Sequence, residues 1–415
     1  MRSQIPAPPP KGDKRRDTVY LKNCRTNGRE SRPMVNQDRL AGTFRDLVEI
    51  DSVSRKEGEI AAVIYNMLKS MGAHVFVDDA GKKTGSNTGN IVAGFPGNMD
   101  EIQPLLLNAH IDTVQPGENI KVLFSDNTFR SDQTTILAAD DKSAVAILLE
   151  ALLVCKEQNV RHGPIELVFT ICEEIGLLGA KHLDYSRITA RYGYCVDATD
   201  VDGIVTRAPA ANRLRFDLRG RDAHAGAAPE KGINAIQMAA KAIAGLTLGR
   251  IDEETTANIG VISGGKATNI VPDMVRVEGE VRSHDTEKLA RETARIVEAF
   301  EHETATYKET SLSDDGLPDV EVSILPDFPT LNVPEDHIVV QLAKKAALNK
   351  GHSLVCKKSG GGSDANIFAG KGILTGVLGT GMRDMHTVRE SIRLDDMVKS
   401  AELVLEIIRV HAQGA

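Results

Sequence analysis

Two hydrophobic patterns alternate along most of this chain. Short apolar runs predict buried strands, and longer segments with an apolar residue every three or four positions predict amphipathic helices. Strands that alternate with helices are typical of a mostly parallel α/β sheet with helices on both faces. Between residues 37 and 208 we expect helices at 38–50, 57–71, 141–155 and 178–183, strands at 74–78, 90–93, 104–109, 165–171 and 192–196, and a polar loop at 81–89.

The pattern changes near Pro209, where residues 213–218 alternate like a half-buried antiparallel strand. The α/β pattern resumes after Pro334. The intervening order β-α-β-β-α-β is that of a ferredoxin-like unit, so we predict an inserted domain at 209–327. The expected elements after Pro209 are helices at 234–246, 286–304, 336–349 and 394–411 and strands at 258–262, 275–282, 320–325 and 374–378. The α/β domain would then comprise 34–208 and 328–415.

Residues 1–33 differ in composition from the rest of the chain. They hold nine Lys or Arg against three Asp or Glu, include Pro-Pro-Pro at 8–10, and show no hydrophobic periodicity. We interpret them as a disordered basic tail. An organelle-targeting segment and a wrongly assigned start, with Met34 as the true first residue, are the alternatives.

A protein that starts at Met34 is expected to keep its melting temperature and its activity. Residues 1–33 have no apolar face to bury, so they cannot offset the entropy lost on ordering. Thermal unfolding and functional assays of the two forms test this. A clear loss of either property would show that the tail docks on the protein or completes its site.

Composition narrows the classes of function. The net charge of −8, without a basic domain, argues against a nucleic-acid partner, and no apolar run is long enough to span a membrane. The five cysteines form no Cys-x-x-Cys pair, and Cys155, Cys172 and Cys195 lie in apolar runs as expected of buried thiols. Scattered, odd-numbered cysteines fit a reducing compartment, so we expect a cytoplasmic protein.

Residues that can bind metal follow several of the predicted strands. His110 and Asp112 follow strand 104–109 and point to the same face because they are two residues apart. The imidazole can bind a metal, and the carboxylate can bind it too or orient the ring. Sites in α/β sheets gather at the carboxyl ends of strands. Glu173 and Glu174 follow strand 165–171, Asp197 follows strand 192–196, and His386 follows strand 374–378 through a Gly-rich turn. Asp140 and Asp141 close a loop just before a predicted helix, whose N-terminal amides favour anions.

Each of these residues alone has an ordinary interpretation. Asp140 or Asp141 could cap the following helix, Glu173 and Glu174 could be solvated, and His386 could be a loop residue. Their joint placement instead indicates a site. Imidazoles and carboxylates without thiolates suit catalytic Zn²⁺, with Mn²⁺ and Co²⁺ as alternatives. The set suffices for two ions ~3.5–4 Å apart that share a carboxylate, leaving one glutamate as general base for a bridging water.

At these residues the chain resembles the M20 metallopeptidases, in particular their peptidase T-like (tripeptide aminopeptidase-like) branch, over about residues 35–412. The motifs that carry the resemblance are NAHIDTV at 108–114, ADDK at 139–142, CEEIGLLGA at 172–180, Asp197, SGGGSDAN at 359–366 and MHT at 385–387. The resemblance implies a zinc-exopeptidase-like sheet with an inserted lid and dimerisation domain. It also implies His110, Asp140 and Asp197 as ligands of one ion and Asp140, Glu174 and His386 as ligands of the other.

The resemblance assigns further roles. It makes Glu173 the general base and Asp112 the residue that orients His110. The chain departs from the family at Ala138, where members usually have Gly before Ala-Asp-Asp-Lys.

The predicted lid domain also matches positions with roles in relatives. A His at the position of His224 reaches a partner's active site and stabilises the oxyanion, which implies a homodimer formed through the lid. Asn269 and Arg282 match substrate-contacting positions, and the loop containing Gly361 lines the substrate pocket. Without the resemblance, His224 is a turn residue before a Gly-rich loop.

No competing motif is complete. The chain lacks a dinucleotide fingerprint, a phosphate loop and a Gly-x-Ser-x-Gly elbow. We therefore expect a two-metal exopeptidase that hydrolyses short peptides, like a tripeptidase or aminopeptidase. The first alternative is an amidohydrolase of the same fold, either an N-acyl amino acid deacylase or a carboxypeptidase. A more distant alternative is a relative without activity that uses the pocket for binding or the lid for assembly.

Overall fold

The computed structural model describes residues 34–99, 101–310 and 316–414. The predicted tail at 1–33 lies outside these residues. A nine-stranded sheet runs through the first and last parts of the chain, in the order β1-β2-β6-β3-β7-β16-β8-β14 with β15 beside β8. Its strands are β1 (His74–Val77), β2 (Ile91–Phe95), β3 (Leu105–His110), β6 (Ile165–Thr170), β7 (Tyr192–Ala198), β8 (Gly203–Ala208), β14 (Leu331–Asn332), β15 (Val355–Lys358) and β16 (Leu374–Gly379).

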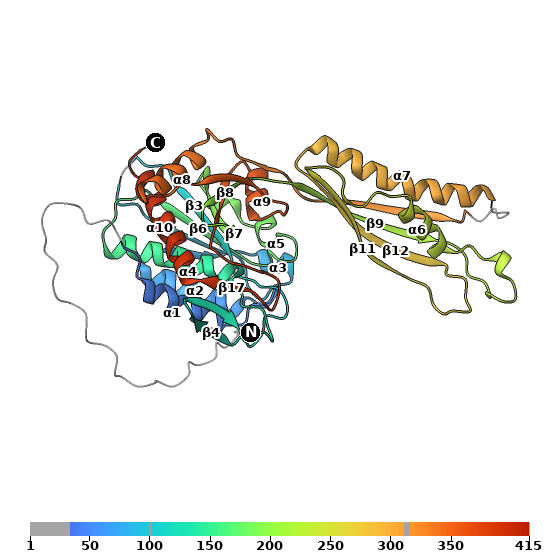
Figure 1. The fold of residues 1–415 in the computed structure, drawn as a ribbon, viewed down its shortest axis with the longest axis horizontal. Helices are drawn as coiled ribbons and strands as arrows, with labels where there is room; N and C mark the ends of the chain where they lie inside the picture. Colours follow the sequence, from blue (N-terminus) through green and yellow to red (C-terminus); the bar gives the residue numbers. More distant parts are fainter. Residues whose placement is uncertain (1–33, 100, 311–315, 415) are drawn as a thin grey trace, which may run out of the picture. The chain divides into compact units, whose positions relative to one another are not determined.

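The centre of this sheet is parallel, as the alternating pattern predicted. Strands β6, β3, β7 and β16 are parallel neighbours, and their apolar runs are buried because helices flank the sheet. Helices α10, α4 and α1 pack against one another (Figure 1). The flanking helices are α1 (Gln37–Val48), α2 (Gly58–Met71), α3 (Ala80–Thr84), α4 (Ala139–Glu157), α5 (Leu178–Lys181), α8 (Ile338–Asn349), α9 (Asp364–Gly370) and α10 (Leu394–His411).

Residues 210–328 form a second, five-stranded antiparallel sheet with its own hydrophobic core. Helices α6 and α7 pack on this sheet (Figure 1), and Phe216 stacks on Phe300 with ring centroids 4.0 Å apart. Apart from the additional two-residue strand β10, the elements follow the predicted β-α-β-β-α-β order, and the domain limits at 209 and 327 stay a prediction. They are β9 (Ala210–Arg219), α6 (Ala235–Ala244), β10 (Gly249–Arg250), β11 (Thr255–Gly264), β12 (Met274–Ser283), α7 (Thr286–Thr310) and β13 (Asp319–Phe328).

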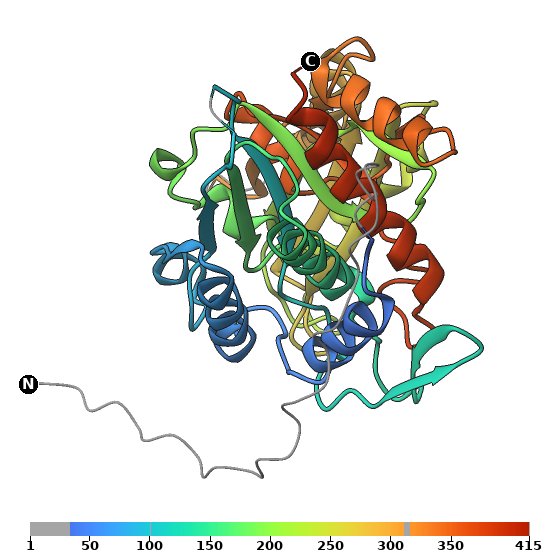
Figure 2. The same ribbon diagram turned by 90° about the vertical axis from the view of Figure 1, so that its left-hand side faces the viewer.

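A small third sheet joins distant parts of the sequence. Its strands are β4 (Val122–Ser125), β5 (Thr128–Ser131) and β17 (Ser391–Arg393), in the order β17-β5-β4 (Figure 2). Strand β17 pairs with β5 in antiparallel register, Ile392 opposite Phe129. This pairing brings the segment after residue 386 close to the segment that leads into α4.

The structure corrects several local predictions. Residues 81–89 are not a continuous loop, because they contain most of α3. Helix α9 begins within the loop predicted at 359–364, where Ser363 and Asn366 form a capping box. Strands β4, β5, β8, β10, β14, β15 and β17 were not predicted. In the described part of the chain no helix has the length and apolar character needed to cross a bilayer. Cys155, Cys172 and Cys195 are buried and unpaired, as expected.

Candidate metal centre

The predicted metal ligands and the predicted general base meet at one edge of the nine-stranded sheet. His110 is the last residue of β3, Asp197 lies near the end of β7, and Glu173 and Glu174 follow β6. Because these strands are parallel, their carboxyl ends share that edge. Asp140 lies at the start of α4 and His386 in the loop after β16, so these two side chains are not carried by strand ends.

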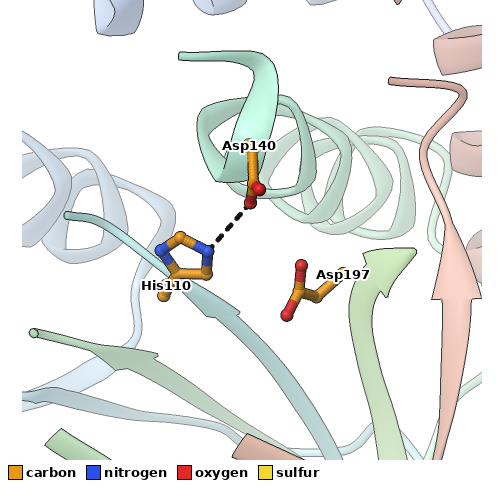
Figure 3. A group of neighbouring side chains, drawn as sticks. All are labelled: His110, Asp140 and Asp197. Carbon is orange, nitrogen blue, oxygen red and sulfur yellow. Dashed lines mark hydrogen bonds and ion pairs between the residues drawn. The ribbon is translucent and has the colours of Figure 1, made fainter. Parts of the chain in front are cut away.

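The first group of candidate ligands is His110, Asp140 and Asp197. Figure 3 shows the three side chains pointing toward one another from β3, the start of α4 and β7. His110 Nε2 lies 3.0 Å from Asp140 Oδ1, and one candidate atom of each residue lies within 4.8 Å of the others. A single ion could therefore contact all three residues.

The second group shares Asp140 with the first. His386 Nε2 lies 3.2 Å from Asp140 Oδ2 and 3.1 Å from both oxygens of Glu174. Candidate atoms of Asp140, Glu174 and His386 also lie within 4.8 Å of one another. Asp140 thus turns one oxygen toward each histidine, which is the arrangement expected of a carboxylate that bridges two ions.

Asp112 connects the first group to the two glutamates. Its buried carboxylate accepts hydrogen bonds from the backbone N–H of Glu173 at 2.8 Å and of Glu174 at 3.3 Å, and from Ser54 Oγ at 2.7 Å. His110 Nδ1 lies 3.4 Å from this carboxylate and 3.0 Å from the Asp112 backbone oxygen. Asp112 is therefore placed both to orient the His110 ring and to hold the loop that carries Glu173 and Glu174.

The electrostatics of the cluster fit divalent cations. Burial raises the pKa of Glu173, Glu174 and Asp197, and a neighbouring carboxylate raises each further. Burial also opposes the charge of Asp140, but hydrogen bonds with the two histidines hold its pKa well below the usual range. Hydrogen bonds to Asp140 and Glu174 raise the pKa of His386 to about 10. Crowded carboxylates with two imidazoles form a donor set that suits Zn²⁺, Mn²⁺ or Co²⁺.

A cavity of about 580 Å³ opens onto both groups. Glu173 lines it beside the candidate ligands, and so do Arg282 and Gly361, two of the predicted substrate-contacting residues. The Arg282 guanidinium lies 5.9 Å from the centre of the Phe328 ring and pairs with Glu280 at 2.9 Å. The cavity therefore combines the acidic cluster with a cationic side chain and an aromatic wall.

His224 and Asn269 do not line this cavity. Both are exposed, and His224 Nδ1 accepts hydrogen bonds from the backbone N–H of Gly226 and Ala227, each at 3.1 Å. The backbone oxygen of Asn269 accepts from Ala225 N–H at 2.9 Å, so the two residues belong to neighbouring loops. Within one chain the structure does not bring them to the candidate ligands, and their roles stay a prediction.

Two buried carboxylates beside the candidate ligands received no role from the sequence. Asp141 accepts from the backbone N–H of His110 at 3.2 Å, and Asp364 accepts from the Thr170 hydroxyl and from Asn108 Nδ2. The other oxygen of each has no hydrogen-bond partner among the described residues. Both lay inside recognised motifs, but residue type alone did not separate a second layer of acids from the ligands.

A third buried carboxylate, Glu390, lay outside every motif. It accepts hydrogen bonds from the backbone N–H of Leu137 and Ala138 at 2.8 Å and of Asp140 at 2.9 Å. Burial raises its pKa to about 7, although these donors favour the carboxylate. Its position four residues after His386 gave no signal in the sequence.

The sequence profile of Peptidase family M20/M25/M40 matches residues 106–410. The Bacillus subtilis protein YqjE is 42% identical over 381 residues, which cover 92% of this chain and 100% of that protein. Peptidase T of Fusobacterium nucleatum is 28% identical over 309 residues, which cover 72% of this chain and 71% of that protein.

Solved structures agree with the sequence comparisons. The aminopeptidase PepT of Bacillus cereus is 43% identical with a TM-score of 0.82, and the match covers 91% of this chain and 100% of that one. A tripeptidase of Staphylococcus aureus is 38% identical with a TM-score of 0.85, covering 92% and 100% of the two chains. A dinuclear metal binding peptidase of the M20 family from Bacillus subtilis, 18% identical with a TM-score of 0.67 over 91% and 99%, shares the fold.

Proposed function

This chain belongs to peptidase family M20/M25/M40, and from that membership we propose that it is a two-metal exopeptidase acting on short peptides. The coarser statement, a hydrolase of the peptidase T kind, follows from the comparisons. The two-ion part of the proposal is carried by one observation. Asp140 turns one oxygen toward His110 and the other toward His386, at 3.0 and 3.2 Å.

Two groups of residues would hold the ions. His110, Asp140 and Asp197 would bind one, and Asp140, Glu174 and His386 the other. When bound, such ions supply Lewis-acid polarisation of the scissile carbonyl and lower the pKa of a water molecule. We propose Zn²⁺ as the ion, with Mn²⁺ and Co²⁺ as alternatives.

Glu173 would move the proton. Its carboxylate lines the cavity without being a member of either candidate ligand group, and Asp112 holds its backbone N–H. In the proposed reaction Glu173 accepts a proton from the attacking water and passes it to the leaving amine nitrogen as the C–N bond breaks. Burial and the nearby Asp197 raise the pKa of Glu173, which brings its proton affinity closer to that needed near neutral pH.

The size of the cavity supports a small substrate. Pockets for small molecules span ~300–1,000 Å³, and the 580 Å³ here lie within that range. Arg282 and Gly361, which line the same cavity, would contact the peptide. We also propose a cytoplasmic location, because unpaired cysteines such as the buried Cys155 and Cys195 persist in reducing compartments.

A substrate panel tests the proposed activity. Free tripeptides, dipeptides and N-acetyl amino acids would be assayed on the Zn²⁺-, Mn²⁺- and Co²⁺-loaded protein, with N-acetylated and C-amidated tripeptides added to identify the end that is recognised. We expect free tripeptides to be cleaved fastest. Their cleavage should be lost when the N-terminus is acetylated and retained when the C-terminus is amidated. Preferred hydrolysis of N-acetyl amino acids would instead indicate a deacylase. Metal binding without turnover of any of these substrates would indicate a binding protein.

We also propose a homodimer formed through α6 and β11. In the described part of the chain, β10 pairs with only Thr256 and Ala257 of β11, while Val261 and Ile262 further along that strand are each at least half exposed. Open strand edges with apolar side chains favour pairing with another chain, and a two-fold dimer would close this edge. The dimer would carry His224 of one subunit toward the other subunit's cavity.

Mixed dimers are expected to regain activity that each parent lacks. His224→Ala removes a donor to the developing oxyanion, worth ~2.7–4 kcal/mol, and Glu173→Gln removes the base. After subunit exchange, one site of the mixed dimer has an intact base and an intact His224 from its partner. Turnover should therefore rise well above the sum of the parents, as measured after co-incubation under conditions that allow exchange.

Sedimentation and a control mixture complete this test. The protein should sediment as a dimer at micromolar concentration, and Glu173→Gln mixed with itself should gain nothing. A monomer with full activity would exclude the trans-acting His224, and a dimer whose mixed variants show no recovery would place His224 in its own subunit or outside the reaction.

A further inference from the structure

We propose that Glu390 is a positioning residue of the metal centre: it holds Asp140 in place relative to His386. The inference rests on the proposed two-ion site and extends it to a residue outside the candidate ligands. Glu390 is 1% exposed and is not among the residues that line the cavity at the metal centre, so any effect on the reaction must act through its neighbours.

Both oxygens of Glu390 hold the backbone just before α4. Oε2 accepts from the N–H groups of Leu137 and Ala138, each at 2.8 Å, and Oε1 accepts from Asp140 N–H at 2.9 Å. One carboxylate thus binds three of four successive backbone N–H groups. The last of them belongs to the residue shared by the two candidate ligand groups.

The backbone of this segment needs such a partner. Ala138 has a φ of +63°, in the left-handed region that L residues rarely adopt, and Asp140 has non-helical angles although it lies within α4. The segment is buried, and buried N–H groups without an acceptor are strongly disfavoured. The carboxylate of Glu390 therefore compensates a conformation that regular helix hydrogen bonds do not support.

The same side chain is anchored close to His386. Glu390 N–H donates to Thr387 O at 3.0 Å, and Arg383 and Ser391 exchange two backbone hydrogen bonds that close the base of this loop. Ser391 then continues into β17, which pairs with β5. Glu390 thus lies at the fixed base of the loop that carries His386.

This connection matters because of where the candidate ligands come from. The sheet fixes His110 and Asp197 directly, since both lie at strand ends. Asp140 comes from the irregular start of α4 and His386 from a loop, yet their Oδ2 and Nε2 atoms lie only 3.2 Å apart. Glu390 connects these two segments, and residues that orient ligands typically change metal affinity ~10–100-fold when replaced.

The test compares Glu390→Gln with a matched control. An amide keeps the shape but turns an NH₂ group toward one of the backbone donors, so at least one of the three contacts is lost. Glu150→Gln is the control, because Glu150 is 2% exposed, lies on α4, and accepts from Asn36 N–H and the Arg39 guanidinium away from the site. Both variants lose contacts of a buried carboxylate.

Zn²⁺ affinity by chelator competition, the visible spectrum of the Co²⁺ form, and thermal unfolding in chelator are measured on the full chain. Glu390→Gln should bind at least one ion ~10–100-fold more weakly and alter the Co²⁺ spectrum, with a fall in kcat greater than any change in KM. Glu150→Gln should match the unaltered protein in affinity and spectrum. If Glu390→Gln differs from the unaltered protein only in unfolding temperature, Glu390 is an ordinary structural acid and the proposal is overturned.

A second variant covers the case in which Glu390→Gln does not fold. Ala138→Gly removes the cost of the left-handed conformation at this position. The double variant that carries both Ala138→Gly and Glu390→Gln should therefore regain stability while its metal affinity stays low. Recovery of both properties would overturn the proposal. An unaltered protein that binds no divalent ion would instead refute the proposed metal centre itself, which separates the two failures.

Discussion

Glu173→Gln is expected to lower turnover by at least ~10²–10⁴-fold while metal content stays near that of the unaltered protein. The amide has the shape of the carboxylate but cannot accept a proton from water or return one to the leaving amine. Glu173 is in neither candidate ligand group, so its replacement leaves both sets of ligands intact. Turnover of a good tripeptide substrate and metal analysis of the same sample measure the two quantities.

A buried glutamate elsewhere provides the control for Glu173→Gln. Glu292 on α7 is 7% exposed and pairs with Arg295 at 2.5 Å, in the part of the chain with its own core. Glu292→Gln should cost some stability but keep its turnover. A Glu173→Gln variant with more than a tenth of the original activity would remove Glu173 from the role of general base.

The central sheet could be predicted because its physics is local. Strands such as β3 and β6 are buried on both faces, so their sequences are nearly continuous apolar runs. In the helices between the strands, apolar residues recur every three or four positions. Strands β4 and β17 could not be predicted in this way. Val122–Ser125 is mostly exposed, and Ser391–Arg393 is a strand only because distant β5 offers it a partner.

Some residues of the candidate site could likewise be predicted from the sequence, and others could not. His110, Asp197 and Glu174 could be proposed as ligands because residue type and strand-end position together indicate metal chemistry. Glu390 could not be identified, because its partners are backbone N–H groups from a segment remote in sequence. Only part of what distinguishes Ala138 could be seen in the sequence. The unusual Ala at a Gly position was visible, but its left-handed conformation became apparent only in the structure.

Removal of divalent ions by a chelator is expected to abolish turnover and lower the unfolding temperature. Burial and neighbouring carboxylates already raise the pKa of Glu174 and Asp197, so the cluster is electrostatically costly without cations. An ion present at ~1,000 times its dissociation constant stabilises the folded state by ~4 kcal/mol. Unfolding scans with and without chelator, followed by readdition of Zn²⁺, Mn²⁺ or Co²⁺, measure the effect.

Asp140→Asn should reproduce most of the chelator's effect with one substitution. Asp140 belongs to both candidate groups, whereas Asp197 and His386 each belong to one, so Asp197→Asn and His386→Ala should each weaken mainly one ion. Asp217→Asn is the matched control, because Asp217 is also buried but is held by Arg215 and Arg276 away from the site. It should lose stability and keep its metal.

The number of ions lost by each variant then decides whether a ligand is shared. Loss of both in Asp140→Asn and of one in Asp197→Asn is the pattern that a bridging carboxylate requires. If Asp140→Asn kept both ions, the two groups would not share a ligand. The 3.2 Å contact between Asp140 and His386 would then be an ordinary ion pair, and the chemistry of this cavity would have to be built around two ions that are held independently.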